Sequence, residues 1–218
     1  MSKLIVSPSI LSADFSDLAG EIKNLNDTEC EWIHFDVMDG HFVNNLTFGA
    51  PLIKSVRALS TKIFDVHLMM ENPLKYLDDF VDAGSDYISI HLECEDVKQM
   101  GAIHCLEMIK KKGVKAGLVI QPDTNVAEII SYLPYCDLVL VMSVYAGFGG
   151  QSFIESSLNK ISLLNEIISS LTNEVLISVD GGINNKTVHD VKQSGANIII
   201  SGSYIFKGNY NERIKNLK

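Results

Sequence analysis

The segment DAGSDYISIH, residues 82–91, contains the pattern that decides the fold. Polar residues typical of a helix end come first, followed by Gly84 and then by a run that includes Ile88 and Ile90. Glycine readily adopts the left-handed conformation that often follows a last helical turn, and β-branched residues favour strands. The same order recurs in KKGVKAGLVI at 111–120 and in QSGANIIISG at 193–202. The sequence therefore predicts helices that each lead directly into a strand.

The rest of the chain repeats this alternation of strand and helix. Amphipathic stretches at 16–25 and 157–171 predict helices, and the apolar runs predict buried parallel strands. An open doubly wound sheet usually has a glycine-rich turn after its first strand, but here SPSIL at 7–11 contains no glycine. We therefore expect one single-domain (β/α)8 TIM barrel over residues 1–218. Its eight strands are expected to begin near Ile5, Trp32, Lys62, Tyr87, Lys115, Leu138, Val175 and Asn197.

Composition narrows the possible partners. The 218 residues have a net charge of −9, which argues against binding to a nucleic-acid backbone as the main role. No apolar run approaches the roughly 20 residues that cross a bilayer, and the apolar stretch after Met1 to Lys3 is too short for a signal peptide. We expect a cytoplasmic protein with no membrane or nucleic-acid partner. Its scattered cysteines are expected to be reduced thiols, at Cys30, Cys94, Cys105 and Cys136.

Polar and methionine residues alternate along several of the predicted strands. Because side chains of a strand point to opposite faces in turn, each alternating set shares one face. Imidazole and carboxylate groups buried together are costly unless they pair or bind a cation, and this mixture suits Zn²⁺, Fe²⁺, Mn²⁺ or Co²⁺. A single strand histidine is more often structural, but the recurrence favours a metal site. The sets are His34, Asp36 and Met38; Asp65, His67 and Met69; Leu140, Met142 and Val144; and Ser178 and Asp180.

Glycine-rich turns follow the sixth, seventh and eighth predicted strands. They are AGFGGQ at 146–151, DGG at 180–182, and Gly202 with Ser203. Backbone N–H groups of such turns can hold a phosphate, although one turn alone could be a tight connection. We expect a side chain at Gly149 or Gly202 to block the anion and to force a disfavoured backbone angle.

The remaining histidines have different expected roles. His91 and Glu93 share a face of the fourth strand, where we favour a supporting role over direct metal binding, although their spacing does not separate the two. We expect no chemistry from the histidines on the loop and helix surface, which are His41, His104 and His189.

Five stretches of the chain resemble the ribulose-phosphate 3-epimerase family. The resemblance extends from the first strand to Gly202 and Ser203, which is nearly the whole chain. It implies a (β/α)8 barrel isomerase of the pentose phosphate pathway that interconverts D-ribulose 5-phosphate and D-xylulose 5-phosphate. The stretches are SPSIL at 7–11, HFDVMDGHFV at 34–43, DVHLM at 65–69, GFGGQ at 147–151 and VDGGI at 179–183.

The resemblance also implies roles for individual residues. Asp36 and Asp180 would be the acid–base pair that moves the C3 proton through an enediolate, and with His34 and His67 they would bind one divalent metal ion per chain. Three methionines, Met38, Met69 and Met142, would line the site of the intermediate. The sugar phosphate would contact Ser9, His67, Gly147, Phe148, Gly149, Gly150, Asp180, Gly181, Gly182, Gly202 and Ser203.

Several alternatives remain open at this stage. Gln121, Tyr145 and Asn44 depart from the residues usual in the family, so a six-carbon ketose phosphate such as D-allulose 6-phosphate is a possible substrate. A metal-dependent hydrolase and a noncatalytic sugar-phosphate sensor are the alternatives from other classes, and the paired aspartates speak against both. Apolar residues in the loop at 39–50 predict either packing under the barrel rim or contacts in a homo-oligomer. They are Phe42, Val43, Leu46 and Phe48.

Overall fold

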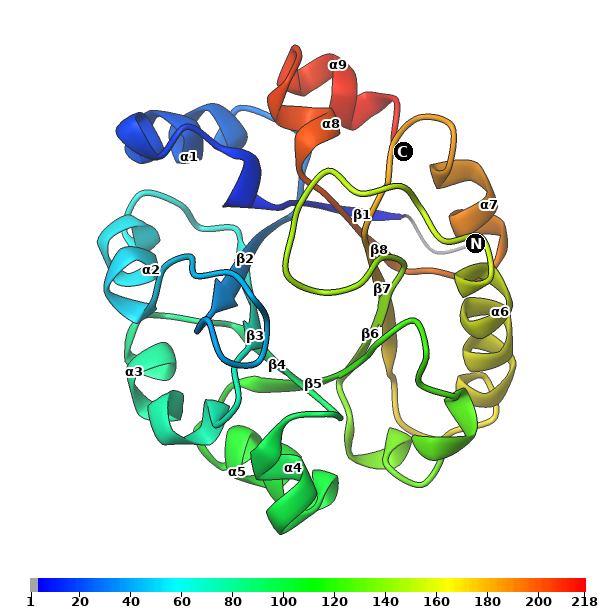
Figure 1. The fold of residues 1–218 in the computed structure, drawn as a ribbon. Helices are drawn as coiled ribbons and strands as arrows, with labels where there is room; N and C mark the ends of the chain where they lie inside the picture. Colours follow the sequence, from blue (N-terminus) through cyan, green and yellow to red (C-terminus); the bar gives the residue numbers. More distant parts are fainter. Residues whose placement is uncertain (1–3) are drawn as a thin grey trace.

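The computed structural model describes residues 4–218, in which eight parallel strands form one sheet that curls into a barrel (Figure 1). The hydrogen-bonded order is β1-β8-β7-β6-β5-β4-β3-β2. The ring closes between β1 and β2, where Ser9 and His34 form a parallel bridge. The strands are β1 Ile5–Pro8, β2 Trp32–Met38, β3 Ile63–Met69, β4 Tyr87–His91, β5 Lys115–Ile120, β6 Leu138–Met142, β7 Leu176–Asp180 and β8 Ile198–Ser201.

Helices surround the barrel in Figure 1, as the sequence predicts. In the described residues the connection between β5 and β6 differs, because it contains two short 3-10 helices, Val126–Glu128 and Leu133–Tyr135, in place of an α-helix. The α-helices are α1 Leu18–Asn26, α2 Ala50–Arg57, α3 Leu77–Asp82, α4 Glu95–Met100, α5 Ala102–Lys111, α6 Ser157–Ile168, α7 Val188–Gln193, α8 Ser203–Phe206 and α9 Tyr210–Lys215. Further 3-10 helices span Ile10–Ser12, Phe15–Asp17 and Pro73–Tyr76.

The predicted element boundaries agree closely with the structure. Five predicted strands begin at the expected residue, and β3, β7 and β8 begin one residue later than expected. The predicted helix at 16–25 corresponds to α1, which is preceded by a 3-10 turn, and the one at 157–171 corresponds to α6, which ends at Ile168, three residues earlier than predicted. The junction glycines Gly84, Gly113 and Gly195 all have positive φ, so each helix ends where glycine permits the chain to turn toward a strand.

The barrel has two apolar layers. Strand side chains that point outward, such as Ile33, Phe35 and Val37, pack with the helices in the main core. Side chains that point inward, such as Leu140 and Ile200, fill the interior. The mixed polar and methionine sets therefore belong to the inner face of the barrel, which confirms the prediction from alternation.

Two sequence-based expectations include residues outside the described part of the chain. The extent of a single domain over residues 1–218 and the interpretation of Met1 to Lys3 both stay predictions, because the structure describes residues 4–218. None of the helices within residues 4–218 has the length and apolar character that a membrane crossing requires. All four cysteines are free and buried.

Candidate metal centre and cavity

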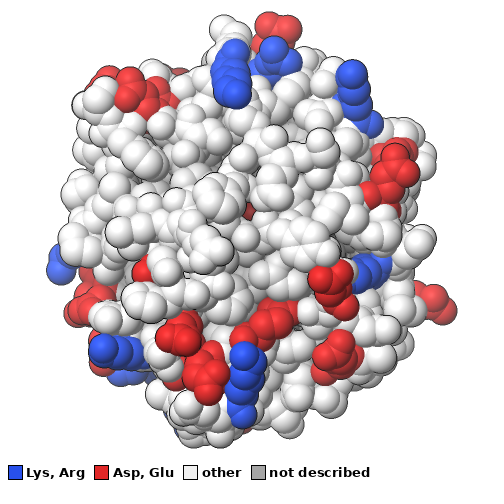
Figure 2. All heavy atoms as spheres, viewed as in Figure 1, with Lys and Arg blue, Asp and Glu red and all other residues white. Residues whose placement is uncertain are grey.

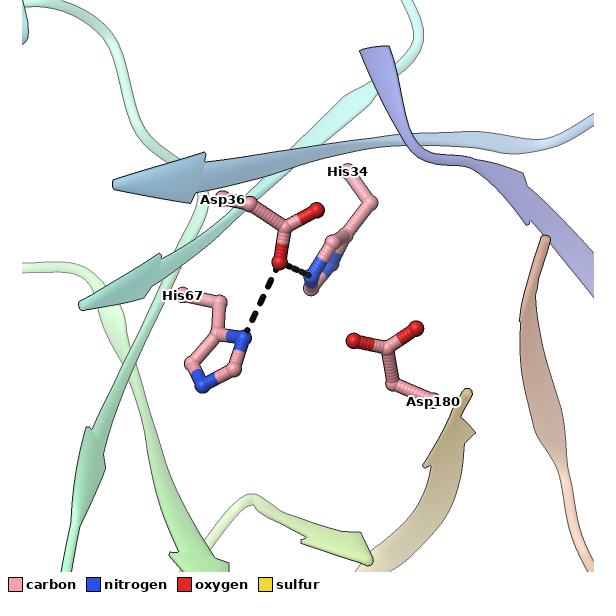
Figure 3. Close-up of side chains that lie close together, drawn as sticks. All are labelled: His34, Asp36, His67 and Asp180. Atoms are coloured by element: carbon pink, nitrogen blue, oxygen red, sulfur yellow. Dashed lines mark hydrogen bonds and ion pairs between the residues drawn. The ribbon is translucent and has the colours of Figure 1, made fainter. Parts of the chain in front are cut away.

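The register of the sheet brings the predicted metal ligands together. On β2 and β3, Asp36 is paired with His67 and His34 is paired with Asp65. Asp180 ends β7, from which β8 and β1 lead back to β2 in the closed ring. Figure 3 shows His34, Asp36, His67 and Asp180 pointing toward one another inside the barrel. One potential ligand atom from each of these residues lies within 4.8 Å of the others.

The donor atoms fit a divalent cation. Asp36 Oδ1 lies 3.3 Å from His34 Nε2 and 3.2 Å from His67 Nδ1. Two ligands at about 2.1 Å from one ion, about 90–110° apart, are themselves about 3.0–3.4 Å apart. His34 Nε2 is buried and has no hydrogen-bond partner among the described residues, so this polar atom faces the cluster unsatisfied. Two imidazoles and two carboxylates are also the donor types that Zn²⁺, Fe²⁺, Mn²⁺ and Co²⁺ accept.

Neighbouring side chains fix the orientation of these donors. Asp65 Oδ2 lies 2.7 Å from His34 Nδ1, which directs His34 Nε2 toward the cluster. Ser9 Oγ donates a hydrogen bond to Asp36 Oδ2 at 2.5 Å, so Ser9 contacts a metal-ligand candidate as well as the cavity. Sequence reasoning placed Asp65 on the correct face but missed its contact with His34. The sequence contains part of the signal, because the complementary motifs His-x-Asp and Asp-x-His lie on consecutive predicted strands, but the register that pairs His34 with Asp65 comes from the folded sheet.

The two aspartates have different proton affinities. Burial alone would raise the pKa of Asp36, but the charge and hydrogen bonds of His34 and His67 outweigh it and lower that pKa far below its usual value. Burial, with a contribution from the charge of Asp36, raises the pKa of Asp180 to about 7. Near neutral pH the ion-free protein therefore has one ionised carboxylate beside one that retains a large share of its proton.

The histidine pKa values also move in opposite directions. Burial disfavours the charged form of His34, yet Asp36 and Asp65 together hold the pKa of His34 well above its usual value. For His67 burial dominates and lowers the pKa to about 4. Of the two imidazoles, His67 is therefore the one held neutral, which is the form that binds a metal.

A cavity of about 710 Å³ opens above the four side chains. Asp36 and Asp180 face this cavity, whereas His34 and His67 are fully buried and do not form its lining. The structure thus brings together all the predicted substrate-contact residues except His67, together with the three methionines. The predicted residues in the lining are Ser9, Met38, Met69, Met142, Gly147, Phe148, Gly149, Gly150, Asp180, Gly181, Gly182, Gly202 and Ser203.

The glycines of these turns are constrained in different ways, some by a positive φ angle and some by the space available for a Cβ. At Gly182 φ is +66°, and a Cβ would lie 2.5 Å from the backbone nitrogen of Phe153. Gly202 has φ of −101°, so the expected backbone strain there is wrong; its constraint is space, because a Cβ would lie 2.6 Å from Ser12 Oγ. Gly149 also lacks a positive φ, and a Cβ there would make only ordinary contacts. The expectation of strain at both positions failed because strain requires positive φ, which the sequence alone does not show.

The loop at 39–50 supports the cavity. Val43 packs with Met38 and Met69, and Asn45 Nδ2 donates a 2.7 Å hydrogen bond to the carbonyl of Gly147. These contacts show the packing role that the sequence predicted as one possibility. Leu46 is 74% exposed in the same loop, and the oligomer interface stays a prediction.

The three departures from the usual family residues lie at different distances from the site. Tyr145 lines the cavity and donates a hydrogen bond to Asp123. Gln121 is not part of the lining; its Oε1 accepts a hydrogen bond from the N–H of Ala146 at 3.3 Å. Asn44 is exposed. Of the three, Tyr145 therefore has the most direct access to a ligand in the cavity.

The cavity also contains residues that sequence analysis missed. Arg213 reaches it from α9, with its guanidinium carbon 4.5 Å from the centre of the Tyr204 ring, and Lys186 reaches it from the loop after β7. No local motif marks either residue. On the face seen in Figure 2, the Lys and Arg side chains lie around the edge, and the centre consists mainly of uncharged side chains. An anion at this face is therefore held by local groups and not by a broad basic surface.

Comparison with known proteins agrees with the motifs. Residues 5–206 match the sequence model of the Ribulose-phosphate 3 epimerase family. The chain is 44% identical to the ribulose-phosphate 3-epimerase of Synechocystis, covering 100% of this chain and 95% of the relative. It is 43% identical to the protein of the same name from Bacillus subtilis, covering 92% of this chain and 91% of the relative.

Solved structures of distant sequence share the fold. The tryptophan synthase alpha-subunit of Pyrococcus furiosus aligns with a TM-score of 0.71 at 15% identity, over 98% of this chain and 96% of that one. KGPDC from Streptococcus mutans aligns with a TM-score of 0.68 at 16% identity, over 98% and 95%. At this identity the likeness concerns the fold alone. The family match over residues 5–206 and the full-length relatives decide the assignment: the chain belongs to the ribulose-phosphate 3-epimerase family.

Proposed function

We propose that this protein is a ribulose-phosphate 3-epimerase that interconverts D-ribulose 5-phosphate and D-xylulose 5-phosphate. The observation that carries the proposal is the pair Asp36 and Asp180, which face one cavity from β2 and β7 and differ in proton affinity. The chain's membership in the epimerase family supports the same activity.

Inversion at C3 explains why two carboxyl groups are needed. The C3 proton is acidic because it lies next to the C2 carbonyl, and its removal gives an enediolate. A single base could only return the proton to the face from which it came. With two carboxyl groups, the ionised one accepts the proton from one face while the other donates a proton to the opposite face. In the ion-free protein the pKa of Asp36 is lowered and that of Asp180 is raised, so the two carboxyl groups differ in proton affinity before any cation binds.

We further propose that His34, Asp36, His67 and Asp180 hold one divalent cation. The distances between their ligand atoms and the types of these atoms fit such an ion. When bound, the cation supplies positive charge that stabilises the negative charge developing on the sugar oxygens. The hydrogen bond from Ser9 to Asp36 and the contact of Asp65 with His34 hold two of the ligands in place before substrate arrives.

Phosphate binding is assigned to the glycine turns after β6, β7 and β8. The lining of the cavity includes Gly147 to Gly150, Gly181 with Gly182, and Gly202 with Ser203, so their backbone amides are available near one another. Phosphate held there contributes binding energy remote from the reacting carbon and orients the sugar. Met38, Met69 and Met142 contribute apolar side chains to the lining and help to exclude water from the reacting carbon.

The proposal is tested by exchange of the C3 proton with solvent deuterium. Purified, metal-analysed protein is incubated in D₂O with five- and six-carbon ketose phosphates, and label and configuration at C3 are followed by NMR. An epimerase incorporates deuterium at C3 and forms the other epimer, with the five-carbon substrate expected to react fastest. Absence of exchange with a metal-loaded sample contradicts the proposal and favours a hydrolase or a sensor. Faster reaction of the six-carbon sugar changes the substrate but not the chemistry.

A further inference from the structure

A series of contacting side chains leads from His67 through the buried His91 to the partly exposed Glu93. His67 Nε2 lies 2.8 Å from His91 Nε2, and His91 Nδ1 lies 3.2 Å from Glu93 Oε2. Both histidines are fully buried, so water does not compete for the contact between them, whereas the side chain of Glu93 is 28% exposed. The proposed reaction uses neither His91 nor Glu93, and neither residue lines the cavity.

Glu93, at the far end of this series of side chains, is held in place by the loop after β5. Glu93 Oε1 accepts a 3.1 Å hydrogen bond from the N–H of Gln121 and a further hydrogen bond from Thr124 Oγ1. Lys160 Nζ in turn donates hydrogen bonds to the carbonyl oxygens of Gln121, Pro122 and Thr124, which anchors this loop. The carboxylate of Glu93 therefore has one oxygen committed to the loop and the other available to His91.

The available protons dictate the direction of each hydrogen bond. An ionised carboxylate only accepts, so His91 Nδ1 must carry a proton and donate it to Glu93. Neutral His91 then accepts at Nε2, and a 2.8 Å contact between two nitrogens holds one proton, which His67 Nε2 must supply. His67 Nδ1 is thereby left with a free lone pair, and this is the nitrogen that faces Asp36.

We infer that His91 and Glu93 are positioning residues that fix the tautomer of His67, so that Nδ1 of His67 is free to bind the metal. The inference rests on the proposed metal site. Asp36 lies 3.2 Å from His67 Nδ1 and favours a proton there, so the chain to Glu93 opposes this pull. His34 needs no such relay, because Asp65 contacts its Nδ1 directly.

Replacing Glu93 with glutamine reverses the direction of the hydrogen bonds along this series of side chains, while the side chain at position 93 keeps its shape. The N–H of Gln121 cannot turn round, so the amide oxygen of the new side chain must face it. The amide nitrogen then faces His91 Nδ1 and donates to it. His91 would donate from Nε2 to His67, and the proton of His67 would move to Nδ1, where it competes with the metal.

The test is a competition titration of Zn²⁺ between the full-length protein and a chromogenic chelator at fixed pH. We expect Glu93→Gln to weaken Zn²⁺ binding by roughly 10- to 100-fold, the usual effect of losing a partner of a metal-bound histidine. Glu95→Gln is the matched control, because the side chain of Glu95 contacts Gln99 and Lys98 on the solvent side of α4, and this variant should bind Zn²⁺ as the wild type does. Unchanged Zn²⁺ affinity in folded Glu93→Gln overturns the inference.

Histidine ¹⁵N NMR of the Zn²⁺-free protein reads the tautomer directly. We expect His67 protonated at Nε2 in the wild type and at Nδ1 in Glu93→Gln, a switch that a packing role would not produce; a wild type protonated at Nδ1 refutes the inference.

A second variant, His91→Phe, removes the relay but preserves an aromatic ring beside Phe42. It should weaken Zn²⁺ binding less than Glu93→Gln does, because it removes the preference for a proton at Nε2 of His67, whereas Glu93→Gln reverses this preference. The opposite order indicates packing and overturns the inference. If the wild type binds no Zn²⁺, the proposed metal site is refuted, and the inference is refuted with it. The deuterium exchange experiment tests the proposed reaction separately.

Discussion

Gly202→Val separates phosphate binding from metal binding. Gly202 precedes α8, and a Cβ at this position would lie 2.6 Å from Ser12 Oγ and 3.4 Å from the carbonyl oxygen of Ser9. The hydroxyl of Ser12 can rotate away, and φ of −101° is accessible to valine, so we expect the variant to fold. The two added methyl groups, however, occupy space in the proposed phosphate position.

The expected magnitude follows from the contacts that the valine blocks. A hydrogen bond from a backbone amide to a phosphate oxygen is charge-assisted and contributes about 1.5–3 kcal/mol. Loss of one such bond weakens binding by roughly 10- to 150-fold, since about 1.4 kcal/mol corresponds to a factor of ten. Zn²⁺ affinity should stay within about twofold of the wild type, because β8 carries none of the four proposed metal ligands.

The assay is calorimetric titration of the same protein sample with the ketose phosphate and with Zn²⁺. Gly49→Val is the matched control: Gly49 also precedes a helix, it has φ of −127°, and a Cβ there would meet only Pro51 at 3.7 Å. That variant should bind both ligands normally. Wild-type affinity for the ketose phosphate in a folded Gly202→Val protein would refute the placement of the phosphate at this turn.

Three further predictions address catalysis, pH dependence and assembly. Asp36→Asn and Asp180→Asn should each lower the epimerisation rate by at least about 10²- to 10⁴-fold in steady-state assays, because each removes a proton carrier; full turnover by either would contradict the two-base scheme. Burial and a hydrogen bond to Glu21 raise the pKa of Tyr210 well above its usual value of about 10. The folded state thus holds this proton more tightly, so the stability that it contributes is fully present below about pH 10 and is lost as the pH rises above that value. Denaturant unfolding at about pH 8 and about pH 11 should show a smaller loss of stability for Tyr210→Phe than for the wild type, and equal losses would count against this explanation. We also expect a homo-oligomer in sedimentation, which a monomer mass independent of concentration would rule out.

The sequence determined the order and nature of the elements. Apolar runs, three of which follow the junction glycines Gly84, Gly113 and Gly195, located the starts of the eight strands of the described residues to within one residue. Period-two alternation placed His34 and Asp36 on one strand face and Asp65 and His67 on another, because the direction of a strand side chain depends only on its position in the strand. These are local properties, which is why a single sequence carries them.

The residue types in the sequence predicted the kind of site, and the resemblance to the epimerase family implied its individual residues. The combination of imidazoles, carboxylates and glycine turns at strand ends predicted a metal and a phosphate before any distance was known. The structure brings four of these residues, His34, Asp36, His67 and Asp180, within reach of one ion. Which divalent metal binds there is not encoded in the donor set, because several ions accept the same ligands.

The tertiary structure alone decided which side chains meet. Register in the closed barrel, and not spacing along the chain, puts His91 against His67 and brings Arg213 of α9 to the cavity. The same holds for Gly202, whose constraint comes from Ser12 in a different connection and not from its own backbone angle. Such contacts join residues far apart in sequence, and their geometry depends on how the sheet closes, which no local pattern specifies.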